Sequence, residues 1–289
     1  MEKIKIIVDT ISNISKEMAD KYDIGVFSFK LILDDKTYTD MVDMSREEFF
    51  EKLVRADEAH TATPSPEEFK IFIKEFIDQG YNKFLVYATS SGLTGMYNMM
   101  RMTAEEIKED YGVEIEVIDT KSAYIQLTFA AVELSMLVES GASFEEVKDK
   151  AYKNLDKLQA QGVMRSLKYL IKGGRAPKAL LGRVLSELMY PLLSIKKDGA
   201  LTLEKMEIGR TRSLRAYTNM LREDLERHKG KRFCLGLTYG MDRSEFDKVK
   251  EQLKDYMDEA EIYLEEPLTS ALAVHIGPDC LGYTIYPLD

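Results

Sequence analysis

The sequence is poor in cysteine and histidine, which limits the metal and redox chemistry available to it. Its 289 residues include two cysteines, Cys234 and Cys280, and three histidines. The cysteines lie far apart and form no Cys-x-x-Cys pair, so they supply neither a clustered zinc site nor a disulfide framework. We therefore expect a reducing compartment, no metal and no cofactor.

Long apolar runs are also missing. The opening segment, residues 1–9, has an apolar run too short for the core of a signal peptide. No stretch approaches the ~18–20 apolar residues of a membrane span. We expect a cytoplasmic protein without stable membrane insertion. The formal net charge of −10 argues against a nucleic-acid partner, because an acidic surface repels phosphate backbones.

Familiar catalytic signatures are absent as well. The chain has no GxSxG elbow, no GxxxxGK[ST] loop, no GxGxxG after a strand and no HExxH. Of the three histidines only His275 suits a Ser–His–Asp arrangement. It lies in the apolar segment 271–278, where a histidine is either a satisfied core residue or a donor to an anion.

The first half of the chain alternates strand and helix patterns, which predicts a parallel sheet wrapped by helices. Short apolar runs predict buried strands, and serine caps and one apolar segment predict helices. The predicted strands are 4–8, 84–87 and 115–118. Four predicted helices begin after Ser45, Ser65, Gly95 and Ser143, and a fifth spans residues 129–138.

The second half carries a different pattern. Two strand-like runs flank Lys197-Asp198-Gly199, which predicts an antiparallel hairpin. A chain of this length is near the upper limit for one core, so we expect two α/β domains, residues 1–160 and 161–289. The other predicted elements are helices 211–228 and 244–257, the latter capped by Ser244, and strands 233–238, 261–264 and 281–286.

Small hydroxyl residues gather at predicted strand ends. Three clusters, 9–12, 89–95 and 119–122, end strands, and a fourth, 61–65, precedes a helix. Carboxyl ends of parallel strands meet at one edge of a sheet, so together the clusters predict a pocket for a carboxylate or phosphate. Each cluster alone is more typical of helix caps and turns than of a ligand site.

A group of basic residues stands out in this acidic chain. It surrounds the Gly-Gly-Arg of residues 173–175 and continues at Arg210, Arg212 and Arg215. Such a patch predicts either contact with a phosphate-bearing ligand or partner, or a solvated basic face.

Read in order, four sets of motifs resemble those of the DegV family. They span nearly the whole chain, and their joint order and spacing are more specific than any single motif. The first three are Val8–Ile14, Thr61–Phe69 and Ser90–Tyr97. The fourth set has four segments in the second half of the chain: Leu170–Arg175, Leu181-Gly182, His275–Pro278 and Leu281-Gly282.

The resemblance implies a binding subunit rather than an enzyme. A protein of this family encloses one long-chain fatty acid, and residues 1–160 would bind its head group while residues 161–289 cover its tail in a tunnel. A separate fatty-acid kinase would then phosphorylate the carboxylate.

The resemblance also implies roles for single residues. Thr61 and Thr94 would bind the carboxylate, with Ser91 and Gly95 adjacent and His275 assisting. Arg175 and Arg210 would meet the kinase or order the head-group network.

The chain departs from the family pattern in places, and two other functions stay open. Leu127 stands where glycine is expected, and its bulk would reshape or shorten the tunnel. One alternative is a stand-alone enzyme on a small phosphate or carboxylate, with His275 as acid and base and Thr94 or Ser91 as oxyanion host. The other is a ligand-sensing regulatory protein that binds a partner through its basic patch.

Overall fold

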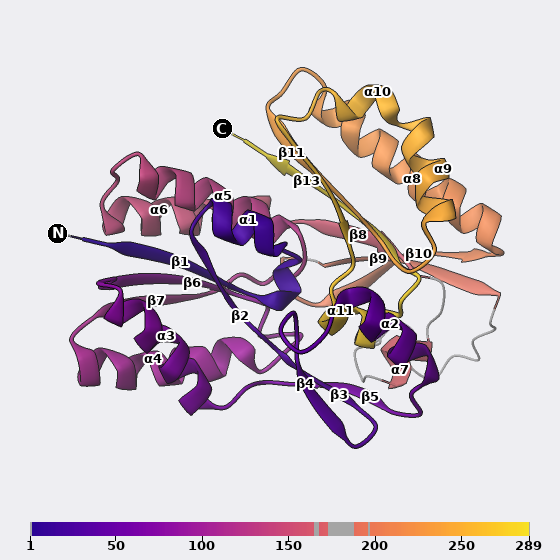
Figure 1. Cartoon of the computed structure of the whole chain (residues 1–289). Helices are drawn as coiled ribbons and strands as arrows, with labels where there is room; N and C mark the ends of the chain where they lie inside the picture. Colours follow the sequence, from indigo (N-terminus) through magenta and orange to yellow (C-terminus); the bar gives the residue numbers. More distant parts are fainter. Residues whose placement is uncertain (1, 165–167, 173–187, 196, 289) are drawn as a thin grey trace.

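The structure is a computed structural model that describes residues 2–164, 168–172, 188–195 and 197–288. Two main sheets stand side by side, and a smaller sheet of three strands lies near their junction (Figure 1). Within the described ranges no helix combines the length and apolarity that a bilayer crossing requires.

The first sheet is parallel, as the alternation of strands and helices predicts. Its four strands are, in spatial order, β2 (Ile24–Phe27), β1 (Ile4–Asp9), β6 (Lys83–Ala88) and β7 (Glu114–Asp119). Its main helices are α3 (Pro66–Asp78), α4 (Met96–Tyr111), α5 (Gln126–Glu139) and α6 (Phe144–Asn154). Figure 1 shows α3 and α4 on one face and α5 and α6 on the other. Every residue of β1 is buried, because both faces are covered.

Serine caps fix where three helices begin. The Ser65 hydroxyl accepts the N–H of Glu68, and the Glu68 carboxylate accepts the N–H of Ser65, which forms a capping box at the start of α3. Ser143 starts α6 with the same arrangement. Ser45 caps α2 (Arg46–Arg55). These predicted helix starts are confirmed.

The second sheet is mostly antiparallel. Its six strands are, in order, β10 (Leu201–Ile208), β9 (Met189–Ile195), β8 (Ala160–Val163), β13 (Leu281–Pro287), β11 (Phe233–Tyr239) and β12 (Ile262–Pro267), and only β11 and β12 pair in parallel. The predicted hairpin is confirmed, because Leu201 faces Ile195 across the turn at Gly199, whose φ is +79°.

The helices of the second half partly differ from the prediction. Helix α8 (Arg210–His228) matches it closely. The predicted helix 244–257 is instead two helices, α9 (Arg243–Gln252) and α10 (Lys254–Met257). The cap of α9 is the Asp242 carboxylate, which accepts the Ser244 N–H at 2.8 Å. Capping by Ser244 was therefore wrong, since an acceptor two residues earlier already starts the helix.

Several short elements escape the sequence patterns. The smaller sheet is antiparallel, with the order β4 (Lys36–Thr39), β3 (Lys30–Leu33) and β5 (Ala59–Ala62). It places Thr61 on a strand rather than in a loop before a helix. The other short elements are η1 (Thr10–Ser12), α1 (Lys16–Lys21), η2 (Leu155–Lys157), α7 (Lys168–Lys172) and α11 (Ser270–Ile276).

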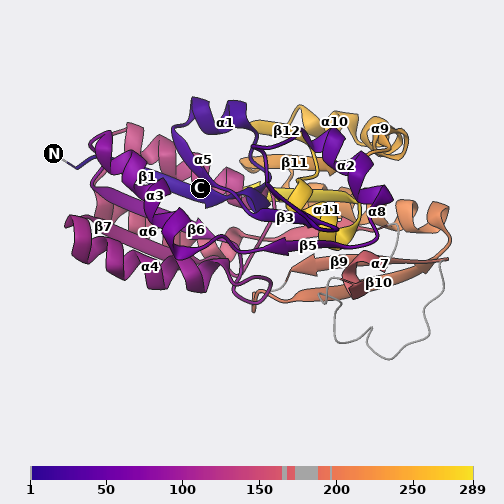
Figure 2. The ribbon, with the colours of Figure 1, turned by 60° about the horizontal axis from the view of Figure 1, so that its bottom comes forward.

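Helix α11 belongs to the second half of the sequence but packs on the first. It contacts α2, β3 and β5, and Figure 2 shows it beside the smaller sheet. Asn13 fixes the segment that leads into it. The Asn13 amide donates to the Pro267 carbonyl at 3.1 Å, and its oxygen accepts the Thr269 N–H at 2.9 Å. The division into domains at residue 160 stays a prediction.

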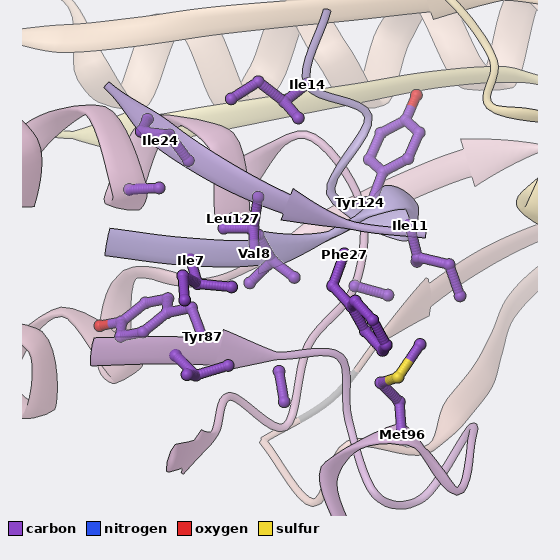
Figure 3. Packing of buried hydrophobic residues seen from close by; sticks show 14 of the residues in the cluster. Ile7, Val8, Ile11, Ile14, Ile24, Phe27, Tyr87, Met96, Tyr124 and Leu127 are labelled. Atoms are coloured by element: carbon purple, nitrogen blue, oxygen red, sulfur yellow. The ribbon is translucent and has the colours of Figure 1, made fainter. Parts of the chain in front are cut away.

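Helix α5 joins the two main sheets. Most of its residues are buried, as expected of a helix that is covered on more than one side. Leu127 lies beside Val8 of β1 (Figure 3), whereas Phe129 packs toward β11 and lies 6.2 Å from the Tyr286 ring of β13. A Cβ at Gly236 would lie 3.0 Å from Phe129, so this strand can approach the helix only without a side chain.

Replacing Phe129 should test how far the fold depends on this helix. Phe129 is 2% exposed, and we expect Phe129→Ala to lower the free energy of unfolding by about 3–5 kcal/mol. Met136 on the same helix is 51% exposed, and Met136→Ala should change it by less than about 0.5 kcal/mol. Urea unfolding followed by far-UV circular dichroism measures both. An equal loss of unfolding free energy in the two variants would contradict the packing assigned to Phe129 and Met136.

Candidate functional site

A mostly apolar cavity lies where the first sheet meets the second. It contains about 800 Å³ of space free of protein atoms, part of it open to solvent. Its walls come from both halves of the chain and include Ile11, Leu93, Tyr124, Leu170, Leu193, Leu201, Leu272 and Cys280.

Two predicted site residues, Thr94 and His275, line this cavity. A third, Thr61, lies beside His275, because its Oγ1 is 2.7 Å from His275 Nε2. His275 is 8% exposed, whereas Thr61 is half-buried. Thr61 of β5 and His275 of α11 are therefore in contact, and Thr94 of the β6–α4 turn lies in the wall of the same cavity as His275. Such groups can hold a carboxylate without placing a fixed positive charge against it.

The segment before α11 sets the position of His275. Thr269 caps α11 by accepting the Leu272 N–H at 3.3 Å. Arg46 also donates to the Pro267 carbonyl at 2.8 Å, beside the bonds from Asn13. His275 therefore occupies a place that contacts with the first half of the chain define.

The turn between β6 and α4 carries Thr94. The Thr94 N–H donates to the Ser90 carbonyl at 3.2 Å, and the Thr94 hydroxyl accepts the N–H of Met96 at 3.2 Å. Gly95 follows, and a Cβ there would lie 3.3 Å from the Thr63 hydroxyl. Without a side chain, residue 95 allows the 61–65 segment to pack close to this turn.

Asp9 supports another part of the cavity wall. Its carboxylate accepts the Thr89 N–H at 2.8 Å and the Thr89 hydroxyl at 2.7 Å, and Thr89 lines the cavity. Burial raises the pKa of Asp9 to about 6, although hydrogen bonds from Thr89 and Ile11 act to lower it. Burial also raises the pKa of Asp40, which lies near Asp9.

Ser91 has a different environment from Thr94. Its hydroxyl accepts from Lys121 Nζ at 2.9 Å, and its N–H donates to Asp119 at 3.1 Å. Ser91 is not among the described residues that line the cavity. Its predicted role next to the carboxylate stays a prediction.

Arg210 and Leu127 are not among the described residues that line the cavity. Arg210 forms a bidentate ion pair with Glu245 and donates to the Met164 carbonyl at 3.4 Å. Leu127 is fully buried in the core and is not among the described residues that line the cavity. Arg175 lies outside the described residues, so its predicted role is untested.

Tyr124 and Cys280 line the cavity, although no motif singled them out. The φ of Tyr124 is +90°, which a bulky residue rarely adopts and which no residue pattern indicates. Cys280 is buried, and burial raises the pKa of its thiol to about 12. In the part of the chain that the structure describes, no group of three or more His, Cys, Asp or Glu side chains is arranged to hold a metal.

Comparisons with known proteins bear on this site. Residues 3–288 match the sequence profile of the DegV family, which is described as a family of uncharacterised proteins. A DegV domain-containing protein of Clostridium acetobutylicum is 27% identical over 290 residues, covering 99% of each chain.

Solved structures give the same fold. A DegV lipid-binding protein from Thermotoga maritima has a TM-score of 0.84 and 24% identity, covering 100% of this chain and 99% of its own. A DegV family protein from Thermus thermophilus, described for its fatty-acid binding, has a TM-score of 0.85 and 22% identity, covering 99% of this chain and all of its own. A stearic acid-binding protein from Eubacterium ventriosum has a TM-score of 0.83 and 24% identity, covering 99% and 98%.

Asp9 should make the free energy of unfolding fall as pH rises. Its pKa is about 6 in the folded state against an ordinary 3.8, so the folded protein holds the proton more tightly. The stabilisation is therefore fully present below pH 3.8 and is lost as pH rises through 6. Between pH 4 and 7 the free energy of unfolding should fall by up to about 3 kcal/mol more in the wild type than in Asp9→Asn.

The comparison of these two proteins uses urea unfolding at a series of pH values. Because the chain has no tryptophan, far-UV circular dichroism is the suitable signal. Asp40 is present in both proteins, so its titration largely cancels in the difference. If the free energy of unfolding changed with pH equally in the wild type and in Asp9→Asn, the raised pKa of Asp9 would be contradicted.

Proposed function

The chain belongs to the DegV family, and from this membership and the cavity we propose that it binds one long-chain fatty acid. The observation that carries the proposal is an apolar cavity with Thr94 and His275 in its wall and Thr61 next to His275. Several proteins of the same fold, two of them described as DegV proteins, are described as binding lipid or fatty acids. The proposed ligand has one polar group and a long apolar tail, which matches this distribution.

The tail supplies most of the binding free energy in this proposal. Each CH₂ moved from water into the cavity contributes about 0.8 kcal/mol. A tail of roughly 16 carbons therefore offsets the loss of translational, rotational and rotamer freedom on binding. No covalent bond to the protein is required.

The carboxylate in this proposal lies at Thr94 and His275. Thr94 can donate its hydroxyl proton, and His275 can donate a ring N–H. Thr61 either binds the carboxylate directly or holds the His275 ring through the 2.7 Å contact. Ser91 and Gly95 border this end through the β6–α4 turn.

We further infer that the bound carboxylate is presented to a separate fatty-acid kinase. A carboxylate held by neutral donors keeps its charge and its nucleophilic oxygen, whereas a paired arginine would compete for both. The oxygen attacks the γ-phosphorus of ATP on the kinase, and ADP leaves. Arg175 and Arg210 are the residues that we propose to meet the kinase or to order the head group.

Palmitate binding tests the proposal directly. Native mass spectrometry of the chain with palmitate should show one added ligand per chain. Thr94→Val removes the hydroxyl and keeps the volume, so it should weaken palmitate binding by about tenfold or more, as expected for a lost hydrogen bond to a charged group.

A matched control uses Thr37, an exposed threonine on β4 of the smaller sheet. Thr37→Val should leave palmitate affinity unchanged in isothermal titration calorimetry. A wild type that takes up no palmitate would reject fatty-acid binding. Equal affinities for wild type and Thr94→Val would reject the placement of the head group.

The kinase step has its own test. With palmitate, ATP and a purified bacterial fatty-acid kinase, hydroxylamine should trap palmitoyl hydroxamate, because it attacks an acyl phosphate. The chain with palmitate and ATP alone should give none. Hydroxamate formed without a kinase, and lost in His275→Ala, would instead favour the stand-alone enzyme.

A further inference from the structure

Strand β10 forms one edge of the second sheet (Figure 2). Among the strands that the structure describes, only β9 pairs with it. The strand is eight residues long, and each of them is at least partly exposed. The outer backbone N–H and C=O groups of an edge strand are a template on which a further strand can form.

A β-bulge divides β10 into two halves. Leu203 faces Leu193 of β9, whereas Lys205 faces Leu192, so Glu204 is one residue more than the ladder needs. Three residues of β10 lie on each side of the pair Glu204-Lys205. The bulge is therefore the centre of the strand.

The two halves of β10 carry apolar residues at matching positions. Leu201, Leu203, Met206 and Ile208 face alternate residues of β9, so they lie on the same face of the sheet. The first three pack against the core that includes the first sheet, whereas Ile208 is 59% exposed. A two-fold axis through the bulge, perpendicular to the sheet, would place Leu201 opposite Ile208 of a second copy. The same axis would place Leu203 opposite Met206 of that copy.

This symmetry also matches opposite charges. Glu204 of each copy would lie beside Lys205 of the other, which gives two such pairs across the axis. Both residues are exposed, and the Lys205 side chain is 57% exposed although it contacts Glu207 of its own chain at 2.6 Å. Opposite charges on neighbouring strands stabilise their pairing, and like charges destabilise it.

The bulge and the lysine make this edge selective. Both features usually protect an edge strand from pairing with unrelated strands. A second β10 is a strand that supplies the matching acidic and apolar residues in register. The opposite edge of the sheet, β12, offers no such match, because its charged residues, Glu265 and Glu266, are both acidic and Pro267 has no N–H.

We propose that β10 is an interaction surface for a second copy of this chain. The two β10 strands pair antiparallel about the bulge and join the two six-stranded sheets into one continuous sheet. One strand from each chain makes a small interface, so the dimer is weak and dissociates on dilution. The proposal does not depend on fatty-acid binding.

Sedimentation velocity of the full chain over a dilution series tests the proposal. The wild type should show a reversible equilibrium between monomer and dimer. Glu204→Lys places lysine beside lysine twice across the axis and should weaken association by about tenfold or more. The double variant Glu204→Lys/Lys205→Glu exchanges the two charges and should recover most of the wild-type association.

Glu75, an exposed glutamate on α3, provides the matched control. Glu75→Lys changes the net charge as Glu204→Lys does and should leave association unchanged, and far-UV circular dichroism checks that each variant is folded. A wild type that stays monomeric at every concentration would overturn the proposal. Association that is insensitive to Glu204→Lys, or that the double variant fails to recover, would overturn the pairing of the two β10 strands.

Discussion

The site depends on the hydrogen bonds of one buried asparagine. Asn13, which follows η1, binds the Pro267 carbonyl and the Thr269 N–H, which are distant in the sequence. Its φ of +62° is a conformation that asparagine tolerates better than most residues. These bonds fix the start of α11, and α11 places His275 against Thr61. Arg46, which also donates to the Pro267 carbonyl, and Thr269, which caps α11, hold the same segment.

A division of charge follows from this arrangement. Thr94 and His275 lie in the wall of a mostly apolar cavity, and the ammonium of Lys121 is paired with Asp119. The guanidinium of Arg210 is likewise paired, with Glu245. In the proposed function, neutral donors suit a carboxylate that has to keep its nucleophilic oxygen. Buried carboxylates such as Asp9 lie behind the wall, where burial favours their protonated form.

The sequence predicted the larger elements well and the smaller ones poorly. Apolar strands such as β1 and β6, the capped helices and the Asp-Gly hairpin have strong local signals, so their prediction succeeded. The strands of the smaller sheet, including β5 with Thr61, are four residues each and carry no clear alternation. The cap of α9 was misplaced because both Asp242 and Ser244 are good capping residues. Hydroxyl clusters indicated the edge of the sheet beside which the cavity lies, whereas the proximity of Thr61 to His275 was expected only from the family resemblance. The φ of Tyr124 depends on tertiary packing, which no local pattern encodes.

The central claim is that the cavity holds a fatty acid with its carboxylate at Thr94 and His275. A crystal structure of the chain with 16-bromohexadecanoic acid would test it most directly, because bromine marks the tail end by anomalous scattering. The account predicts the carboxylate within hydrogen-bond distance of the Thr94 hydroxyl and His275. It places the bromine among apolar residues of the cavity, away from these two. A carboxylate bound elsewhere, or an acid absent from the cavity at saturating concentration, would contradict the account.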